Sequence, residues 1–175
     1  MAPVQLSLLK AATQSSWDDP IVDSLRALVR DSGGLAVFST VTGDRVPASL
    51  INAGVIKHPS TGAPCVAHVA MGDSLRLRRL EKNPGSSVTF HVDRKWLTVE
   101  GGASILYRAS DPRAGRQVGQ QDRAQVEFGG LLRSIYVAAG GGEHPDWEEY
   151  DEAMARESRA VVFLSLGRVY GNYSV

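Results

Sequence analysis

The sequence predicts a mainly β protein with flanking helices, built around an antiparallel barrel. Apolar, β-branched segments follow one another along the chain, over 35–40, 46–56, 65–70, 87–92 and 96–107. Only turns or one short helix separate them, and such short connections favour antiparallel neighbours, because parallel pairs need a long crossover. Gly101 and Gly102 lie inside the longest segment, as expected where a barrel strand bends. A strand over 160–166 is predicted to close the domain.

Helices are predicted on both sides of these strands. The first, over 18–34, begins with an Asp-Pro pair and stops at a Gly-Gly pair. Asp73 or Ser74 caps a short second helix, which an Asn-Pro pair ends. The polar segment 111–136 is predicted to be helical, and a last helix covers 146–156.

A glycine run at 140–142 separates the last two helices. It lacks the Lys-Ser/Thr pair of a nucleotide-binding loop and does not follow a strand. We therefore predict a mobile connection there. In the last helix, Trp147, Tyr150 and Met154 are spaced to share one face, and the acidic residues Glu148, Glu149, Asp151 and Glu152 are expected to face solvent.

Composition and charge fit one cytoplasmic domain, 1–175, whose first 17 residues form an arm. The formal net charge is zero, which argues against nucleic acid as a partner. No apolar run reaches membrane-spanning length and no signal peptide is visible, so no membrane partner is expected either. The single cysteine, Cys65, excludes an internal disulfide, and the four histidines lack metal-ligand spacing, so we predict no metal site.

The strongest local feature is the run Gly-Asp-Ser-Leu-Arg-Leu-Arg-Arg over 72–79. It joins a strand end to a helix start, where unpaired N–H groups and the helix dipole favour an anion. The Ser74 hydroxyl and the guanidinium groups of Arg76 and Arg78 are suitable phosphate donors. Residues two apart on a helix diverge by roughly 200°, so only one arginine is expected to meet a ligand fully. Taken alone, the run is better explained as a solvated basic helix face with Leu75 and Leu80 packed inward.

Hydrolytic machinery is missing from the sequence. It has no Gly-x-Ser-x-Gly motif and no sequence signature of a nucleophile paired with a base. If the chain is an enzyme, a cofactor must carry the reaction, with the protein supplying binding and orientation.

Four ordered segments resemble the superfamily of pyridoxamine-phosphate oxidases and flavin/deazaflavin oxidoreductases. They are Leu-Ala-x-x-Ser/Thr at 35–40, Gly-Asp-Arg-Val-Pro-Ala-Ser-Leu-Ile-Asn at 43–52, Ser-x-Arg-x-Arg-x-Leu-x-x-Asn-Pro at 74–84 and Trp-x-x-Val-Glu-Gly at 96–101. The tail, with 145–150, Arg159 and 168–171, resembles the branch that uses the deazaflavin coenzyme F420. The resemblance implies the FMN-binding split-barrel fold, a split antiparallel β-barrel.

The resemblance also implies site residues. Ser74 and Arg76 match the pair that holds the cofactor phosphate, with Arg78 as a weaker second basic residue. Two strand segments match those that lie along the ring system: Ser49, Leu50 and Ile51, and Val69, Ala70 and Met71. Trp96 matches a position that approaches the cofactor of the other subunit, so a homodimer with the cofactor at the subunit interface is implied.

The function implied is hydride transfer between F420 and an unsaturated organic acceptor. An FMN-dependent oxidase or reductase of the pyridoxamine-phosphate-oxidase type is the alternative, and a non-catalytic flavin- or deazaflavin-binding protein is the third reading. The sequence names neither the small-molecule substrate nor any catalytic residue.

Overall fold

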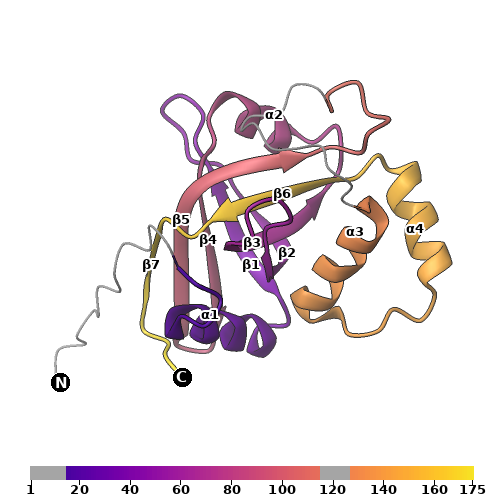
Figure 1. Ribbon diagram of the computed structural model, residues 1–175. Helices are drawn as coiled ribbons and strands as arrows, with labels where there is room; N and C mark the ends of the chain where they lie inside the picture. The colour runs from indigo at the N-terminus through magenta and orange to yellow at the C-terminus, as the bar shows by residue number, and fades with distance from the viewer. Residues whose placement is uncertain (1–14, 115–126) are drawn as a thin grey trace, which may run out of the picture.

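The computed structural model describes residues 15–114 and 127–175, and its centre is a closed barrel of six antiparallel strands (Figure 1). The strands are β1 (Leu35–Thr40), β2 (Ala48–Lys57), β3 (Pro64–Ala70), β4 (Gly85–Val92), β5 (Lys95–Leu106) and β6 (Ala160–Ser165). Their order is β4-β1-β2-β3-β6-β5, and the pairing of β4 with β5 closes the barrel. The predicted mainly β, antiparallel barrel is confirmed.

A short seventh strand, β7 (Arg168–Gly171), pairs with the first half of β5. The second half of β5 pairs with β6 instead. The predicted bend at Gly101 and Gly102 lies where β5 changes from one partner to the other. A Cβ atom added at Gly101 would lie 2.1 Å from the carbonyl oxygen of Ser165, so glycine permits this close approach.

Helices α1 (Pro20–Asp31) and α2 (Leu75–Lys82) lie at opposite ends of the barrel, and α3 (Phe128–Tyr136) and α4 (Trp147–Arg156) lie along one flank (Figure 1). The apolar face of α1 is buried with the barrel interior, and α2 adds Leu77 and Leu80 to the same core. On the flank, α3 and α4 form a second apolar cluster with outward side chains of β3 and β6. No helix within the described residues is long and apolar enough to cross a membrane.

Two predictions about the later chain need correction. Within the described part of the segment 111–136, which was predicted to be helical, only Phe128–Tyr136 is helix, and 111–114 form a bend and turn. Residues 115–126 of that segment, like most of the predicted N-terminal arm, lie outside the described residues.

The glycine run is not a free connection. A π-helical turn, η1 (Val137–Gly141), continues α3 and packs against β2 and α1. The contact is backbone to backbone: a Cβ at Gly54 would lie 2.5 Å from the carbonyl carbon of Ala138, and one at Gly34 would lie 2.0 Å from the oxygen of Ala139. The prediction of a mobile loop is wrong up to Gly141, because two distant glycines admit this turn against the barrel.

Candidate functional site

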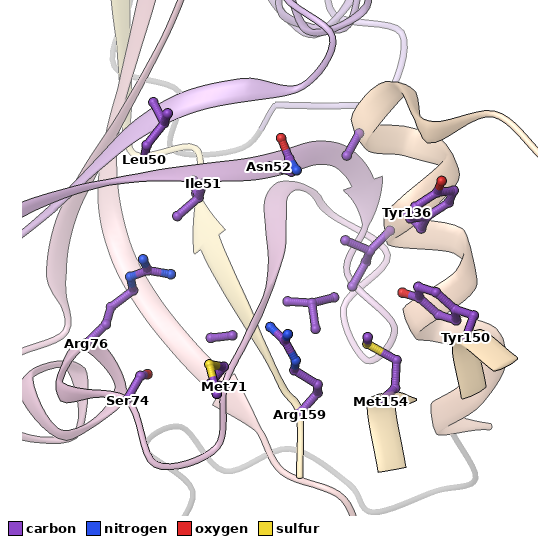
Figure 2. Close-up of a pocket in the computed structure, with 14 residues that line it drawn as sticks. Leu50, Ile51, Asn52, Met71, Ser74, Arg76, Tyr136, Tyr150, Met154 and Arg159 are labelled. Carbon is purple, nitrogen blue, oxygen red and sulfur yellow. The ribbon is translucent and has the colours of Figure 1, made fainter. Parts of the chain in front are cut away.

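A pocket of about 440 Å³ opens between the barrel and its helical flank (Figure 2). One side comes from β2, β3 and α2, and the other from α3, η1, α4 and the turn before β6. The lining residues are Leu50, Ile51, Asn52, Val69, Ala70, Met71, Ser74, Arg76, Ile135, Tyr136, Ala139, Tyr150, Met154 and Arg159. The pocket thus joins segments that are up to about 110 residues apart in the sequence, from Leu50 to Arg159.

Most of the site residues predicted from the sequence meet at this pocket. Leu50 and Ile51 line it from β2, Val69, Ala70 and Met71 from the end of β3, and Ser74 and Arg76 from the start of α2. Ser49 is not in the lining, but its hydroxyl accepts a hydrogen bond of 2.8 Å from Nη2 of Arg76.

The polar end of the pocket is fixed by the start of α2. Ser74 is the N-cap residue, with extended backbone angles, and its Oγ accepts from the N–H of Leu77 at 3.5 Å. Arg76 follows in the first turn and lies over the ring of Phe38, 5.8 Å from its centroid. This half-buried guanidinium is thus oriented from two sides, by the Ser49 hydroxyl and by an aromatic face.

Burial leaves part of the Arg76 guanidinium without a partner. Its Nε is fully buried and makes no hydrogen bond to any residue that the structure describes. Burial also lowers the pKa of Arg76 from its ordinary value, although a guanidinium stays charged in proteins. A buried charge without a counter-charge gains most from an anionic ligand.

The structure does not bring Arg78 and Trp96 to this pocket. Nη2 of Arg78 donates to the carbonyl oxygen of Asp73 at 3.0 Å, and its side chain is exposed, as the divergence of the two arginines predicted. Trp96 is the second residue of β5, where its N–H donates to Oδ1 of Asn172 at 2.8 Å and its ring meets Tyr170 edge-on. The role predicted for Trp96 concerns a partner subunit and stays a prediction.

The helical side of the pocket was missed by the sequence analysis. Tyr150 and Met154 were expected on one face of a helix, but nothing in the sequence said what that face covers. Tyr136 and Ile135 lie in a segment that appeared only polar. Arg159 stood out as a marker of resemblance, and its place in the pocket depends on the turn that leads into β6.

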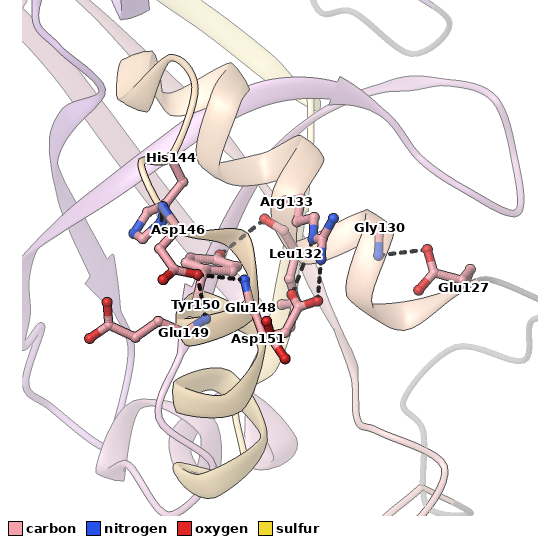
Figure 3. A network of polar contacts seen from close by, with 10 residues as sticks. All are labelled: Glu127, Gly130, Leu132, Arg133, His144, Asp146, Glu148, Glu149, Tyr150 and Asp151. Carbon is pink, nitrogen blue, oxygen red and sulfur yellow. Dashed lines mark hydrogen bonds and ion pairs between the residues drawn. The ribbon is translucent and has the colours of Figure 1, made fainter.

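Polar contacts tie α3 and α4 together behind this side (Figure 3). Nε of Arg133 donates to Asp151 at 3.2 Å, and the buried Tyr150 donates its hydroxyl proton to the carbonyl oxygen of Leu132 at 3.2 Å. Asp146 caps α4 by accepting from two backbone N–H groups. Asp151, predicted to face solvent freely, is therefore paired with α3.

His68 lies behind the polar end, inside the barrel and outside the pocket lining. It is fully buried, with its ring 4.7 Å from that of Phe38. Burial, and to a lesser degree the positive charge of Arg76, lowers the pKa of His68 from 6.5 to about 3. His68 is consequently a neutral imidazole at physiological pH.

The chemistry of the lining suits a planar molecule that carries a phosphate. Its two charged residues, Arg76 and Arg159, are both cationic, and no aspartate or glutamate is among the lining residues that the structure describes. The remaining walls are mostly apolar or aromatic. Hydroxyl and guanidinium donors at one end and apolar walls beyond them fit the phosphate and ring system of a flavin or deazaflavin.

Comparison with known proteins supports the fold. No protein-family model matches the chain. A conserved hypothetical protein from Mycobacterium tuberculosis superposes with a TM-score of 0.58 over 94% of this chain and 88% of its own, at 15% identity. A pyridoxamine 5'-phosphate oxidase-like protein from Listeria innocua (TM-score 0.52, 13% identity) covers 87% of this chain and 98% of its own. The chain has the split-barrel fold.

A third similar structure is that of a heme storage protein from Vibrio cholerae. It superposes with a TM-score of 0.52 at 15% identity and covers 89% of this chain and 95% of its own. Proteins named for pyridoxamine 5'-phosphate oxidation and for heme storage thus share this fold, and only the residues of the pocket distinguish between their ligands.

Proposed function

We propose that this protein is an oxidoreductase that holds coenzyme F420 in the described pocket and reduces an unsaturated organic acceptor. The observation that carries the proposal is the Arg76 guanidinium, bound by the Ser49 hydroxyl at 2.8 Å, beside the Ser74 hydroxyl in a pocket whose charged residues are cationic. The resemblance of the tail, with 145–150, Arg159 and 168–171, to the F420-using branch favours the deazaflavin over FMN.

In this proposal the residues of the chain bind the cofactor and orient it. Ser74 and Arg76 would hold the phosphate, and the β2 and β3 residues from Leu50 to Met71 would lie against the ring system and keep water from one face. When bound, a reduced deazaflavin supplies a hydride, which adds to one carbon of the acceptor's double bond while a proton from solvent adds to the other.

Two alternative functions would use the same pocket. FMN carries a phosphate that the same donors would hold, and a protein that binds the cofactor without turnover would need no further residue. The Vibrio cholerae neighbour stores heme, but neither histidine nor cysteine lines this pocket within the described residues. The lining therefore favours a flavin-type ligand over heme, although tyrosine and methionine also ligate heme iron.

We further propose a homodimer that forms on the outer sheet face next to the pocket. Leu35, Val37 and Leu50 expose 44%, 37% and 62% of their surface on β1 and β2. Val37 pairs with Leu50 on one side and with Thr89 on the other, so these side chains share a face. Leu50 also lines the pocket, which makes the pocket continuous with this apolar face.

Trp96 and Tyr170 lie on the same face. The register continues the row from Thr89 through Thr98 to Tyr170, whose ring meets that of Trp96 at 6.0 Å. A second copy docked here would bring an aromatic pair towards the neighbouring pocket. The substitution Val37→Asp should give a monomer in sedimentation equilibrium because it buries an unpaired charge; a wild-type protein that is already monomeric would contradict the dimer.

Ligand titration tests the function. The purified protein is titrated separately with oxidised F420, FMN and hemin, followed by fluorescence and by the heme absorption band. We expect saturable binding of F420 that is tighter than that of FMN, and no specific heme spectrum. Binding of FMN without F420 would assign the alternative cofactor, and a heme spectrum typical of a ligated iron would overturn the flavin-type proposal.

Turnover separates an enzyme from a carrier. The loaded, reduced protein is mixed with quinones and electron-poor alkenes, and the return of the oxidised deazaflavin absorbance is measured. An acceptor-dependent rate above that of free cofactor is expected. Equal rates with and without protein would favour the non-catalytic reading.

A further inference from the structure

A second arginine reaches the pocket from a different part of the fold. Arg159 follows α4, and its guanidinium group points into the space between the β3 end and the helical side (Figure 2). The preceding residue, Ser158, has a left-handed backbone (φ 48°), and the Arg159 N–H donates to the carbonyl oxygen of Met154 at 3.1 Å. This reversal ends α4 and places Arg159 at the pocket just before β6.

The turn that carries Arg159 is packed against the loop before α2. Ala160 pairs with Ala70 at the ends of β6 and β3. A Cβ atom on Gly72 would lie 2.2 Å from the carbonyl oxygen of Ser158, so only glycine permits this approach. The loop that leads to Ser74 and the turn that leads to Arg159 are thus held together, and the two arginines belong to one cavity.

Glu157 fixes the orientation of the second arginine. Nε of Arg159 donates to Oε2 of Glu157 at 2.7 Å, and Nη2 is paired with the same oxygen. Nη1 donates to no residue that the structure describes. Because one edge of the guanidinium is held by Glu157, the group is oriented in advance and loses little side-chain entropy when an anion binds.

The surroundings of Arg159 differ from those of Arg76. The neighbouring wall contains Tyr136, Tyr150 and Met154, and the two tyrosine rings lie 5.4 Å apart. The Tyr150 hydroxyl is already bound to the carbonyl oxygen of Leu132, so this residue offers the pocket mainly its ring. This part of the pocket combines aromatic faces with one cation, which suits a conjugated body that bears an acid group.

We infer that Arg159 binds the carboxylate of the second reactant, and that the acceptor is an aromatic or conjugated carboxylic acid. This inference rests on the proposed function, in which Ser74 and Arg76 hold the cofactor phosphate. The conjugated body of the acceptor lies against Tyr136, Tyr150 and Met154. The carboxylate takes the free edge of a guanidinium that Glu157 already orients.

A matched pair of ligands tests this assignment. The protein loaded with oxidised deazaflavin that lacks its glutamate tail is titrated calorimetrically with trans-cinnamate and with the neutral trans-cinnamamide. The wild type should prefer the acid by about tenfold, the scale of one charge-assisted contact. Arg159→Gln should abolish this preference, and Arg159→Lys should keep part of it.

The exposed Arg156, in the last turn of α4 and outside the pocket lining, provides the control. Arg156→Gln should keep the full preference for the acid. An unchanged preference in Arg159→Gln, or failure of the loaded wild type to bind cinnamate, would overturn the inference. If Arg159→Gln weakens only cofactor that carries its acidic glutamate tail, the anion belongs to the cofactor, and the inference also fails.

Cofactor titration of the wild type separates this inference from the proposed function. A protein that binds neither F420 nor FMN, yet binds cinnamate through Arg159, refutes the function and leaves an acid site. A protein that binds F420 without any preference for the acid keeps the function and refutes the acid site.

Discussion

The two sides of the pocket are built in different ways. On the barrel side, β2, β3 and the start of α2 supply residues within a span from Leu50 to Arg76, and strand register or a helix cap fixes each of them. On the helical side, α3, η1, α4 and the turn at Arg159 are brought to the barrel by tertiary contacts through glycines and by a few polar bonds. The barrel side is therefore rigid through its backbone, whereas the helical side depends on packing.

Acid pH should weaken the barrel through His68, which is the largest effect we expect. The folded state keeps His68 neutral because burial lowers its pKa to about 3, while the unfolded chain takes up a proton near pH 6.5. The free energy of unfolding should then fall as the pH drops from about 6.5 towards 3, by up to about 1.4 kcal/mol per pH unit.

Urea denaturation of the wild type and of His68→Leu at several pH values measures how much His68 contributes to the pH dependence of stability. The slope of stability against pH should be smaller in the variant, because its barrel no longer contains the group that is buried neutral. Parallel slopes would show that His68 does not set the acid sensitivity of the barrel side. His58, whose pKa burial also lowers, contributes equally to both proteins and cancels in the difference.

On the helical side, the largest loss of stability is expected from a methyl group added at the backbone contact between η1 and β2. Gly54→Ala places a Cβ 2.5 Å from the carbonyl carbon of Ala138 and should cost about 1–3 kcal/mol of the free energy of unfolding. Gly102→Ala is the matched strand variant, since its Cβ would meet nothing nearer than 4.0 Å. Denaturation curves that shift equally for both variants would contradict the close packing of η1.

A smaller effect is expected from the hydroxyl that links α4 to α3. Tyr150→Phe removes the 3.2 Å hydrogen bond to the Leu132 carbonyl and should lower the free energy of unfolding by about 0.5–1.5 kcal/mol. Hydrogen exchange of the α3 and α4 amides should rise while the barrel amides stay protected. Uniform loss of protection would mean that the two sides unfold as one unit.

The smallest effect is expected for the chemical labelling of Cys65. This residue of β3 packs in the apolar cluster between the barrel and the helices α3 and α4. Burial raises the pKa of its thiol to about 12, and the side chain is nearly inaccessible. A disulfide reagent should therefore label the native protein only through unfolding, and the Gly54→Ala variant should be labelled faster. Rapid labelling of the wild type would place Cys65 outside the packed cluster.

Local sequence signals were enough to predict the strands of the barrel side, whereas its pocket residues on β2 and β3 were implied only by the family resemblance. Turn residues and β-branched runs predicted the strands. The N-cap at Ser74 and the following arginines offered a phosphate site, which the resemblance then favoured over a solvated helix face. The same helical geometry predicted that Arg76 and Arg78 diverge, and the structure shows Arg78 outside the lining. These signals depend on residues that are close to one another in the sequence.

The helical side could not be predicted in the same way. Its place depends on Gly34 and Gly54, more than 80 residues before the turn that they admit, and neither glycine has a local signature for such a contact. Arg159 enters the pocket because Ser158 reverses the chain and Gly72 accepts that turn. Long-range steric fit of this kind leaves no periodic pattern in the sequence.

Ser74 and Arg76 are proposed to bind the cofactor phosphate, and this is the central claim. Its most direct test is the dissociation constant of F420 for wild type, Arg76→Gln and Arg78→Gln, measured by fluorescence titration. Loss of a charge-assisted contact of about 1.5–3 kcal/mol should weaken binding at least about tenfold in Arg76→Gln. Arg78→Gln, on the same helix with the same loss of charge, should bind like the wild type. Equal affinity in all three proteins, or equal weakening in both variants, would contradict the account.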